Sequence, residues 1–235
     1  MKMNKRNINL LLFSLFLMFL ISIPILNLDN GRSARGGWNR GPWHLLPFGA
    51  DSLSQHYKDR YQVLDEKPLA TLLQDSAKPL VMILVDGWGV PYDESLLDMD
   101  FQMIGGKGVS YAVHKRPFQT TSYAESVEYG NGFKDGIVVD GEDSVGCAKM
   151  DSIVSDGSWS RIAWTVRDTR EGDRDKLHNL LRDISAVVAK YPEVQFIVQG
   201  THRPILGTPE TRRKYLAPWV PVVFINCNLE QSIDR

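Results

Sequence analysis

Apolar residues in the C-terminal three quarters of the chain fall into short runs separated by turn residues, each with the length of one strand or helix. The clearest is the unbroken apolar run Val81 to Val85, typical of a strand that is covered on both faces, and it predicts a strand from Leu80 to Val85. Further runs predict strands at Arg161 to Val166, Val194 to Val198 and Val220 to Ile225, and apolar residues at helical spacing predict a helix from Lys176 to Lys190.

Weaker patterns fill the intervals between these elements. Ser52 to Leu73 reads as helical in parts, Tyr111 to Val113 and Ile137 to Val139 as short strands, Thr120 to Tyr129 as a helix, and Pro91 to Gly108 as an irregular connection. Strands that alternate with helices predict an α/β fold, in which a mostly parallel sheet is sandwiched between helices.

The N-terminus has a different pattern. Lys2, Lys5 and Arg6 precede an apolar run from about Ile8 to Leu28, which at roughly 20 residues is long enough to span a bilayer. The run is longer than the apolar region of a signal peptide and lacks a small-residue cleavage site, so residues 1–28 are predicted to be an uncleaved transmembrane anchor. Residues 29–50 have linker composition, and 51–235 are predicted to be one domain that faces away from the cytoplasm.

Composition narrows the range of partners. The formal net charge is −1 and no basic stripe interleaved with aromatic residues is present, so the sequence offers no electrostatic case for binding nucleic acid. Cys147 and Cys227 are the only cysteines, and they lack the spacing of a zinc site. They could pair in an oxidising compartment or serve as two small buried side chains.

Three polar residues come shortly after predicted strands. Asp86 comes directly after Val85 and begins the segment DGWG, which contains two glycines. His202 comes four residues after the strand predicted to end at Val198, and Asp168 comes two residues after the strand predicted to end at Val166. The carboxyl ends of parallel strands meet at one edge of a sheet, where carboxylates and imidazoles can share a divalent metal. Each also has an ordinary alternative: a turn aspartate, a hydrogen-bonded structural histidine, and a charged segment before a helix.

Thr120 opens the helix predicted from 120 to 129. A hydroxyl at that position is a natural N-cap, because it can accept hydrogen bonds from the unpaired N–H groups of the first turn. The same position favours an anion or an attacking alkoxide. The helix pattern by itself leaves both interpretations open.

Taken together, residues 79–226 resemble the alkaline phosphatase superfamily, which includes sulfatases, nucleotide phosphodiesterases and cofactor-independent phosphoglycerate mutases. The segment VMILVDGWG is similar to the family's first strand and its metal-binding aspartate, and VQFIVQGTHRPILGTPETRRKYLAPWVPVVFI to its late strand, Asp-His pair and following strand. The resemblance implies an alkaline-phosphatase-like core, with Asp86, His202 and Asp168 as ligands of zinc or manganese. It implies Thr120 as the nucleophile, ten residues before Gly130, with Thr121 as the fallback.

The chain also departs from the family pattern. Thr201 stands where the family has the aspartate of its Asp-His pair, no histidine follows Asp168 at the family's spacing, and the family's last histidine has no counterpart up to Arg235. With an incomplete ligand set, we expect a membrane-anchored, non-catalytic module that binds or assembles with other components, such as a membrane protein. The alternative is a metal-dependent hydrolase or transferase of phosphate or sulfate esters that uses Thr120.

Overall fold

The computed structural model describes residues 53–229, except 65–66, 76, 107, 117–119, 131–132, 134–136, 140–142, 168 and 170, and gives only the backbone of 137–139 and 143–145. The predicted anchor at 1–28 and linker at 29–50 lie outside the described residues. Within the described part, no helix has the length and apolar character needed to cross a membrane. The described residues belong to one compact unit, Gly49–Arg235.

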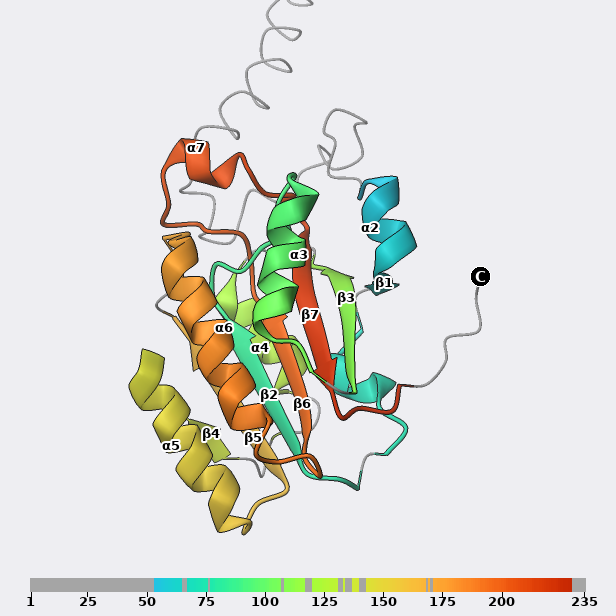
Figure 1. Ribbon diagram of the computed structural model, residues 1–235, viewed down its shortest axis with the longest axis vertical. Coiled ribbons are helices and arrows are strands. Elements are labelled where there is room, and N and C mark those ends of the chain that lie inside the picture. Colours follow the sequence, from blue (N-terminus) through green and yellow to red (C-terminus); the bar gives the residue numbers. More distant parts are fainter. Residues whose placement is uncertain are drawn as a thin grey trace, which may run out of the picture. The chain divides into compact units, whose positions relative to one another are not determined.

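A seven-stranded sheet in the order β1-β3-β7-β6-β2-β5-β4 forms the centre of this unit (Figure 1). Its strands are β1 (Gln62–Leu64), β2 (Leu80–Val85), β3 (Val109–Lys115), β4 (Ile137–Val139), β5 (Arg161–Val166), β6 (Gln195–Gly200) and β7 (Trp219–Ile225). Neighbouring strands are parallel except at β7, which is antiparallel to both β3 and β6. The sheet is therefore mostly parallel, as predicted.

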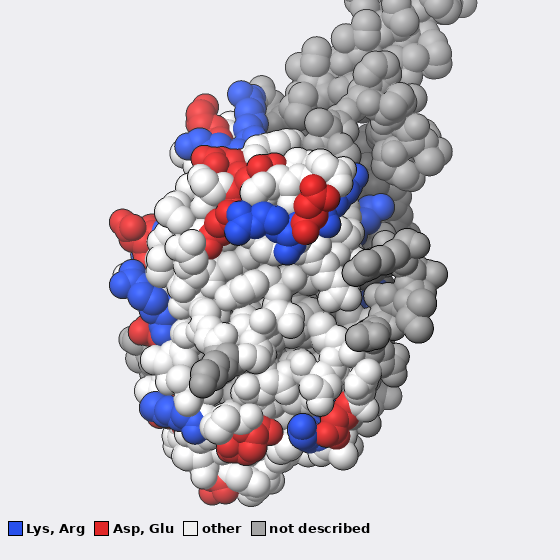
Figure 2. Space-filling view, turned by 45° about the vertical axis from the view of Figure 1, so that its right-hand side comes forward, with Lys and Arg blue, Asp and Glu red and all other residues white. Residues whose placement is uncertain are grey.

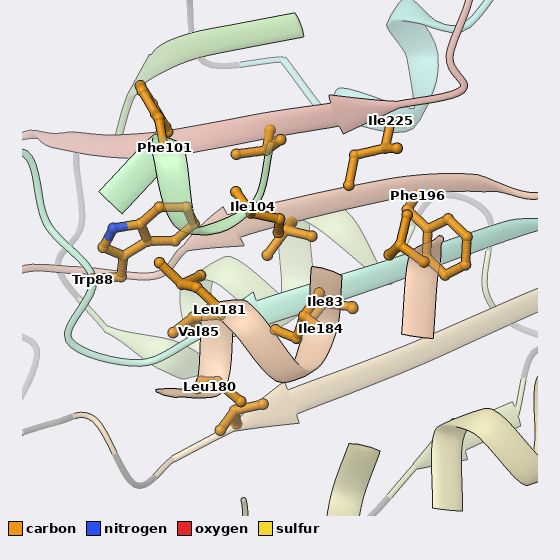
Figure 3. Packing of buried hydrophobic residues seen from close by; sticks show 14 of the residues in the cluster. Ile83, Val85, Trp88, Phe101, Ile104, Leu180, Leu181, Ile184, Phe196 and Ile225 are labelled. Carbon is orange, nitrogen blue, oxygen red and sulfur yellow. The ribbon is translucent and has the colours of Figure 1, made fainter. Parts of the chain in front are cut away.

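One face of the sheet is covered by α2 (Gln55–Arg60), α3 (Glu94–Met103), α5 (Asp143–Asp156) and α6 (Arg174–Val188). α6 presents an apolar stripe to the sheet, and Figure 3 shows Leu181 and Ile184 packed beside Val85 and Ile83 of β2. Every residue of β2 is buried, because the strand lies in the middle of the sheet and both of its faces are covered.

The opposite face carries α4 (Thr121–Glu128) and the 3₁₀ helix η3 (Leu69–Leu72), which pack on a second apolar cluster. Ala124 of α4 and Leu69 of η3 are fully buried there against Met82 and Leu84 of β2. A further short helix, α7 (Pro209–Arg212), lies in the connection between β6 and β7. Helices on both faces of a mostly parallel sheet give the sandwich that the sequence pattern predicts.

Three details differ from the sequence-based prediction. The segment 91–108 is not an irregular connection, because α3 occupies most of it: Asp93 caps the helix by accepting a hydrogen bond from Ser95 N, and Leu97 and Phe101 are buried one turn apart. α5 was not predicted, and its Gly146 packs so closely on Trp164 that a Cβ there would lie 2.5 Å from the indole. Ser52 to Leu73 contains the short strand β1 as well as helical turns.

Close backbone contacts join the loops at the C-terminal edge of the parallel strands. A Cβ on Gly200, the last residue of β6, would lie 1.8 Å from the carbonyl oxygen of Trp88, in the loop after β2. A Cβ on Gly89 would lie 2.8 Å from Arg203 Cα, so the loops after β2 and β6 touch along their backbones. Glycine is required at these positions by space, and the loop that carries Asp86 is fixed against the one that carries His202.

Charged side chains of both signs lie near both ends of the face shown in Figure 2, and the middle of that face carries few of them. Acidic and basic residues lie next to one another in these groups, rather than forming a field of one sign. On this face the charge distribution is that of an ordinary solvated surface.

Candidate functional site

The candidate site lies at the C-terminal ends of β2 and β6. These strands are parallel neighbours with Val85 opposite Gly200, so Asp86 and His202 follow their strands at the same edge. Backbone hydrogen bonds fix the first residue after each strand. Asp86 N donates to Val166 O at 2.9 Å, and Thr201 N donates to Val85 O at 3.0 Å. Asp86 and His202 are both fully buried.

The hydroxyl that lies against this pair belongs to Thr121, the first residue of α4. Thr121 Oγ1 is 2.9 Å from both carboxylate oxygens of Asp86, to which it donates, and 3.3 Å from His202 Nε2. His202 Nε2 is 3.9 Å from Asp86 Oδ1. The three side chains thus form a compact triangle of one carboxylate, one hydroxyl and one imidazole.

Thr120 has a different contact. Its hydroxyl accepts a hydrogen bond from Tyr123 N at 3.2 Å, which makes Thr120 the N-cap of α4. The structure therefore places the fallback residue Thr121, rather than Thr120, beside Asp86 and His202. The sequence pattern could not separate the two, because a shift of one residue in the start of α4 exchanges their roles.

The orientation of His202 follows from its second nitrogen. Nδ1 lies 2.7 Å from the backbone oxygen of Arg203, and because a carbonyl oxygen only accepts, Nδ1 carries the proton and donates it. In the neutral ring, Nε2 then has a lone pair that points toward Thr121 and Asp86. A histidine held through one nitrogen with the other turned inward is the arrangement found in metal-ligating and proton-accepting histidines.

Thr201 supplies a hydroxyl where the resemblance implies a carboxylate. Its Oγ1 donates to Asp86 Oδ1 at 2.7 Å, so two threonine hydroxyls donate to one buried carboxylate. Thr169, in the loop after β5, donates through its hydroxyl to the backbone oxygen of Asp86. These contacts fix the position of Asp86, since two hydroxyls hold its carboxylate and one holds its backbone oxygen.

Donor spacing tests whether these residues fit a divalent metal. Ligands about 2.0 to 2.1 Å from a tetrahedral zinc lie roughly 3.3 Å from one another. The triangle of Asp86, Thr121 and His202, with separations from 2.9 to 3.9 Å, matches one face of such a site. The part of the chain that the structure describes contains no group of three or more His, Cys, Asp or Glu side chains arranged to hold a metal. The triangle therefore fits one cation, for which Asp86 would be the single carboxylate ligand.

Asp168, the third implied ligand, lies outside the described residues. His178 lies in α6, where its Nε2 is 2.9 Å from Asp100 Oδ1, in a cluster with Arg174 and Trp88 that joins α3 to α6. Burial raises the pKa of Asp100, and Arg174 opposes that rise.

Cys147 and Cys227 do not form a disulfide with each other. Cys147 is buried in α5, and burial raises the pKa of Cys227 to about 12, which keeps that thiol protonated and unreactive at neutral pH. Of the two alternatives for these residues, the structure excludes the disulfide and gives a buried Cys147 and a partly buried Cys227.

A buried polar network lies on the α4 face of the sheet. Arg116 Nη2 donates to Glu128 Oε1 at 2.6 Å and to Gln199 Oε1 at 2.7 Å. Glu128 Oε2 accepts from Leu69 N at 2.8 Å, and Gln199 Nε2 is 2.6 Å from His114 Nδ1. Burial raises the pKa of Glu128, and the contacts with Arg116 and Leu69 N–H oppose that rise. The sequence pattern does not reveal this network, since its members are far apart in the chain and match no motif.

Comparison with known proteins gives only distant likenesses. No family model matches the sequence, and no curated protein matches it. Among solved structures, the C-terminal periplasmic domain of EcEptC from Escherichia coli, in complex with Zn, matches with a TM-score of 0.38 and 9% identity, over 66% of this chain and 75% of that chain. The PH0037 protein from Pyrococcus horikoshii matches with a TM-score of 0.35 and 11% identity, over 66% and 87% of the two chains. Likenesses this loose leave the family and activity of the chain to be argued from its own residues.

Proposed function

We propose that the C-terminal edge of the sheet is an ester-transfer site in which Thr121 is the nucleophile and phosphate or sulfate esters are the substrates. The observation that carries the proposal is the position of Thr121 Oγ1, 2.9 Å from both oxygens of Asp86 and 3.3 Å from His202 Nε2. Nucleophile activation needs such a hydroxyl, held within hydrogen-bond reach of a group that can take its proton. The substrate class is the one implied by the resemblance to the alkaline phosphatase superfamily.

The steps follow from these contacts. Thr121 Oγ1 attacks the phosphorus or sulfur atom of the ester, and its proton passes to the Asp86 carboxylate that already accepts it. The bond to the leaving oxygen breaks with its electron pair on that oxygen, which takes a proton from water. Water or an acceptor alcohol then attacks the modified threonine, and the bond to Thr121 Oγ1 breaks with its electron pair on that oxygen, which takes back the proton held by Asp86. The attacking O–H loses its proton to solvent, which replaces the proton that the leaving oxygen took from water.

Thr121, Asp86 and His202 are the residues that would hold a divalent cation. Such a cation would polarise the threonine hydroxyl and neutralise the charge that develops on the transferred group. The location of Thr121 also supports the proposal. Thr121 is the first residue of α4, and the N-terminus of a helix favours a negative charge beside it, such as that of the transferred group.

Replacing Thr121 by valine, which has nearly the same shape and no hydroxyl, tests the proposal. We expect the full-length wild-type chain to hydrolyse an aryl phosphate or aryl sulfate only in the presence of zinc or manganese, and Thr121→Val to reduce kcat by at least about 10³-fold. Thr121→Ser should retain part of the turnover. Thr120→Ser, which keeps the cap, is the matched control and should leave turnover within about twofold. Equal turnover in wild type and Thr121→Val would refute the role of Thr121.

A second candidate function is the non-catalytic module that the sequence favours, in which the same edge of the sheet serves in binding or assembly. Thr201 supports it, because a hydroxyl donates to Asp86 Oδ1 at the position where the resemblance implies a second carboxylate. With one carboxylate fewer, less negative charge is available to hold a divalent cation. In this case the wild-type chain would show no metal-dependent turnover of either ester.

Thr201→Asp separates the two candidates through metal affinity. The new carboxylate would lie beside Asp86, so we expect the variant to be less stable than wild type in a chelator, because of like-charge repulsion. We expect zinc or manganese to bind it at least about tenfold more tightly than wild type, which would appear as a larger rise in Tm on metal addition. Thr201→Asn, similar in shape and neutral, is the control. If Thr201→Asp and Thr201→Asn respond alike to metal, the triangle is not a cation site.

For location, we propose a single-pass membrane protein whose domain lies outside the cytoplasm. The support is the basic N-terminus followed by the apolar run to about Leu28. A membrane protein partner fits this placement, since the domain would be held close to the bilayer. Protection of the domain from external protease in spheroplasts or intact cells would contradict the proposed orientation.

A further inference from the structure

The buried network of Arg116, Glu128 and Gln199 takes no part in the proposed transfer steps, but it connects the two elements that supply the site. Glu128 lies on α4 seven residues after Thr121, two helical turns or about 10 Å along the axis. Ala124, between them, is fully buried, so this side of α4 faces the sheet. Gln199 lies on β6 two residues before Thr201 and three before His202.

One nitrogen joins these elements. Arg116 Nη2 donates to Glu128 of α4 and to Gln199 of β6, at 2.6 and 2.7 Å. Arg116, which follows β3, therefore links α4 to β6 through two hydrogen bonds. The same two elements carry the site, with Thr121 Oγ1 at the start of α4 and His202 Nε2 just after β6, 3.3 Å apart.

The remaining contacts give each member of the network one orientation. Glu128 uses its second oxygen to accept from Leu69 N, and the Gln199 amide nitrogen lies against His114 Nδ1. All four polar side chains are at most 1% exposed. A buried ion pair loses much of its attraction to desolvation, so an apolar pair of similar volume would often stabilise a fold as well or better. What an apolar pair cannot supply is this directional link between helix and strand.

We propose that Arg116 is a positioning residue that sets the distance between the Thr121 hydroxyl and the His202 imidazole by holding α4 to β6 through Glu128 and Gln199. The inference deepens the proposed function and rests on the role given there to Thr121. It makes a prediction about geometry that can be measured whether or not the protein turns over an ester.

The test is the double variant Arg116→Met/Glu128→Leu in the full-length chain, labelled with ¹⁵N-histidine. The variant removes both charges together, so no unpaired buried charge remains and the chain should stay folded. We expect the His202 Nε2 resonance, assigned by its loss in His202→Asn, to shift because its contact with Thr121 changes. Where wild type shows Thr121-dependent turnover, we expect kcat to fall at least tenfold with KM changed by less than threefold.

Two further variants make each result decisive. Ile184→Ala removes core volume on the other face of the sheet and should lower stability without moving the His202 resonance. If the double variant does not fold, Arg116→Lys takes its place, since an ammonium keeps the charge but lacks the planar geometry of the guanidinium. A folded network variant with an unchanged His202 resonance would overturn the positioning role. If wild type has no turnover, the proposed reaction fails, and the resonance still decides the positioning role.

Discussion

Gly200→Ala is expected to cost the domain more than about 3 kcal/mol of its free energy of unfolding. An added Cβ would lie 1.8 Å from the carbonyl oxygen of Trp88 and 3.0 Å from its carbonyl carbon, which are backbone atoms that cannot rotate away. Relief would require the loop after β2 to separate from β6. Inserting even a methyl group into well-packed structure usually costs 1 to 3 kcal/mol, and a contact with backbone belongs at or beyond the upper end of that range.

Urea unfolding of the full-length chain, followed by tryptophan fluorescence, measures the effect. Gly106→Ala is the matched control, because a Cβ at Gly106 would meet only Val109 Cγ2 at 3.7 Å, an ordinary van der Waals distance. We expect its unfolding midpoint to stay within experimental error of wild type. A Gly200→Ala midpoint equal to that of Gly106→Ala would show that the loops after β2 and β6 are not in backbone contact.

Glu128→Ala is expected to cost about 3 to 5 kcal/mol of stability, because it leaves the Arg116 guanidinium buried without its carboxylate. Arg116 and Glu128 are 1% and 0% exposed, and Glu128 also accepts from Leu69 N, which would lose its acceptor. The same measurement of the unfolding midpoint in urea applies. Glu128→Ala and the double variant Arg116→Met/Glu128→Leu should thus differ widely in their free energy of unfolding, although both remove the same ion pair.

Glu125→Ala, three residues earlier in α4, is the internal comparison. Glu125 pairs with Arg167 at 3.0 Å in a half-exposed position, where an ion pair contributes at most about 1 kcal/mol. The two glutamates have the same chemistry and lie in the same helix, so burial is the main difference between them. Equal losses in the two variants would show that the Arg116–Glu128 pair is open to water in solution.

The sequence predicts best those elements whose burial is uniform. β2 and β5 have the predicted bounds, since a strand covered on both faces is a continuous apolar run. α3 was missed although Asp93, Leu97 and Phe101 carry a cap and a helical spacing, because polar residues between them weaken the pattern. The ends of the predicted strands also predicted that Asp86 and His202 lie at the same edge of the sheet, and the parallel pairing of β2 and β6 places them there.

Other features of the site depend on three-dimensional register, which a single sequence does not contain. Whether Thr120 or Thr121 faces Asp86 is decided by where α4 begins, and helix ends are the least reliable part of a pattern-based prediction. The link from Arg116 to Gln199 joins residues 83 positions apart. No local periodicity can indicate such a pair, because its contact exists only after the sheet has formed.

The place of β7 in the sheet has a consequence for how the chain is made. β7 is the last strand in the part of the chain that the structure describes, yet it lies between β3 and β6 and pairs with both. The strands that precede residue 219 belong to two parts of the sheet, β1-β3 and β6-β2-β5-β4, which only β7 joins. Until β7 emerges, each part has an open edge with unpaired backbone groups, which is the kind of surface that pairs with other chains. The interval before β7 arrives is therefore when a nascent copy of this protein is most exposed to aggregation.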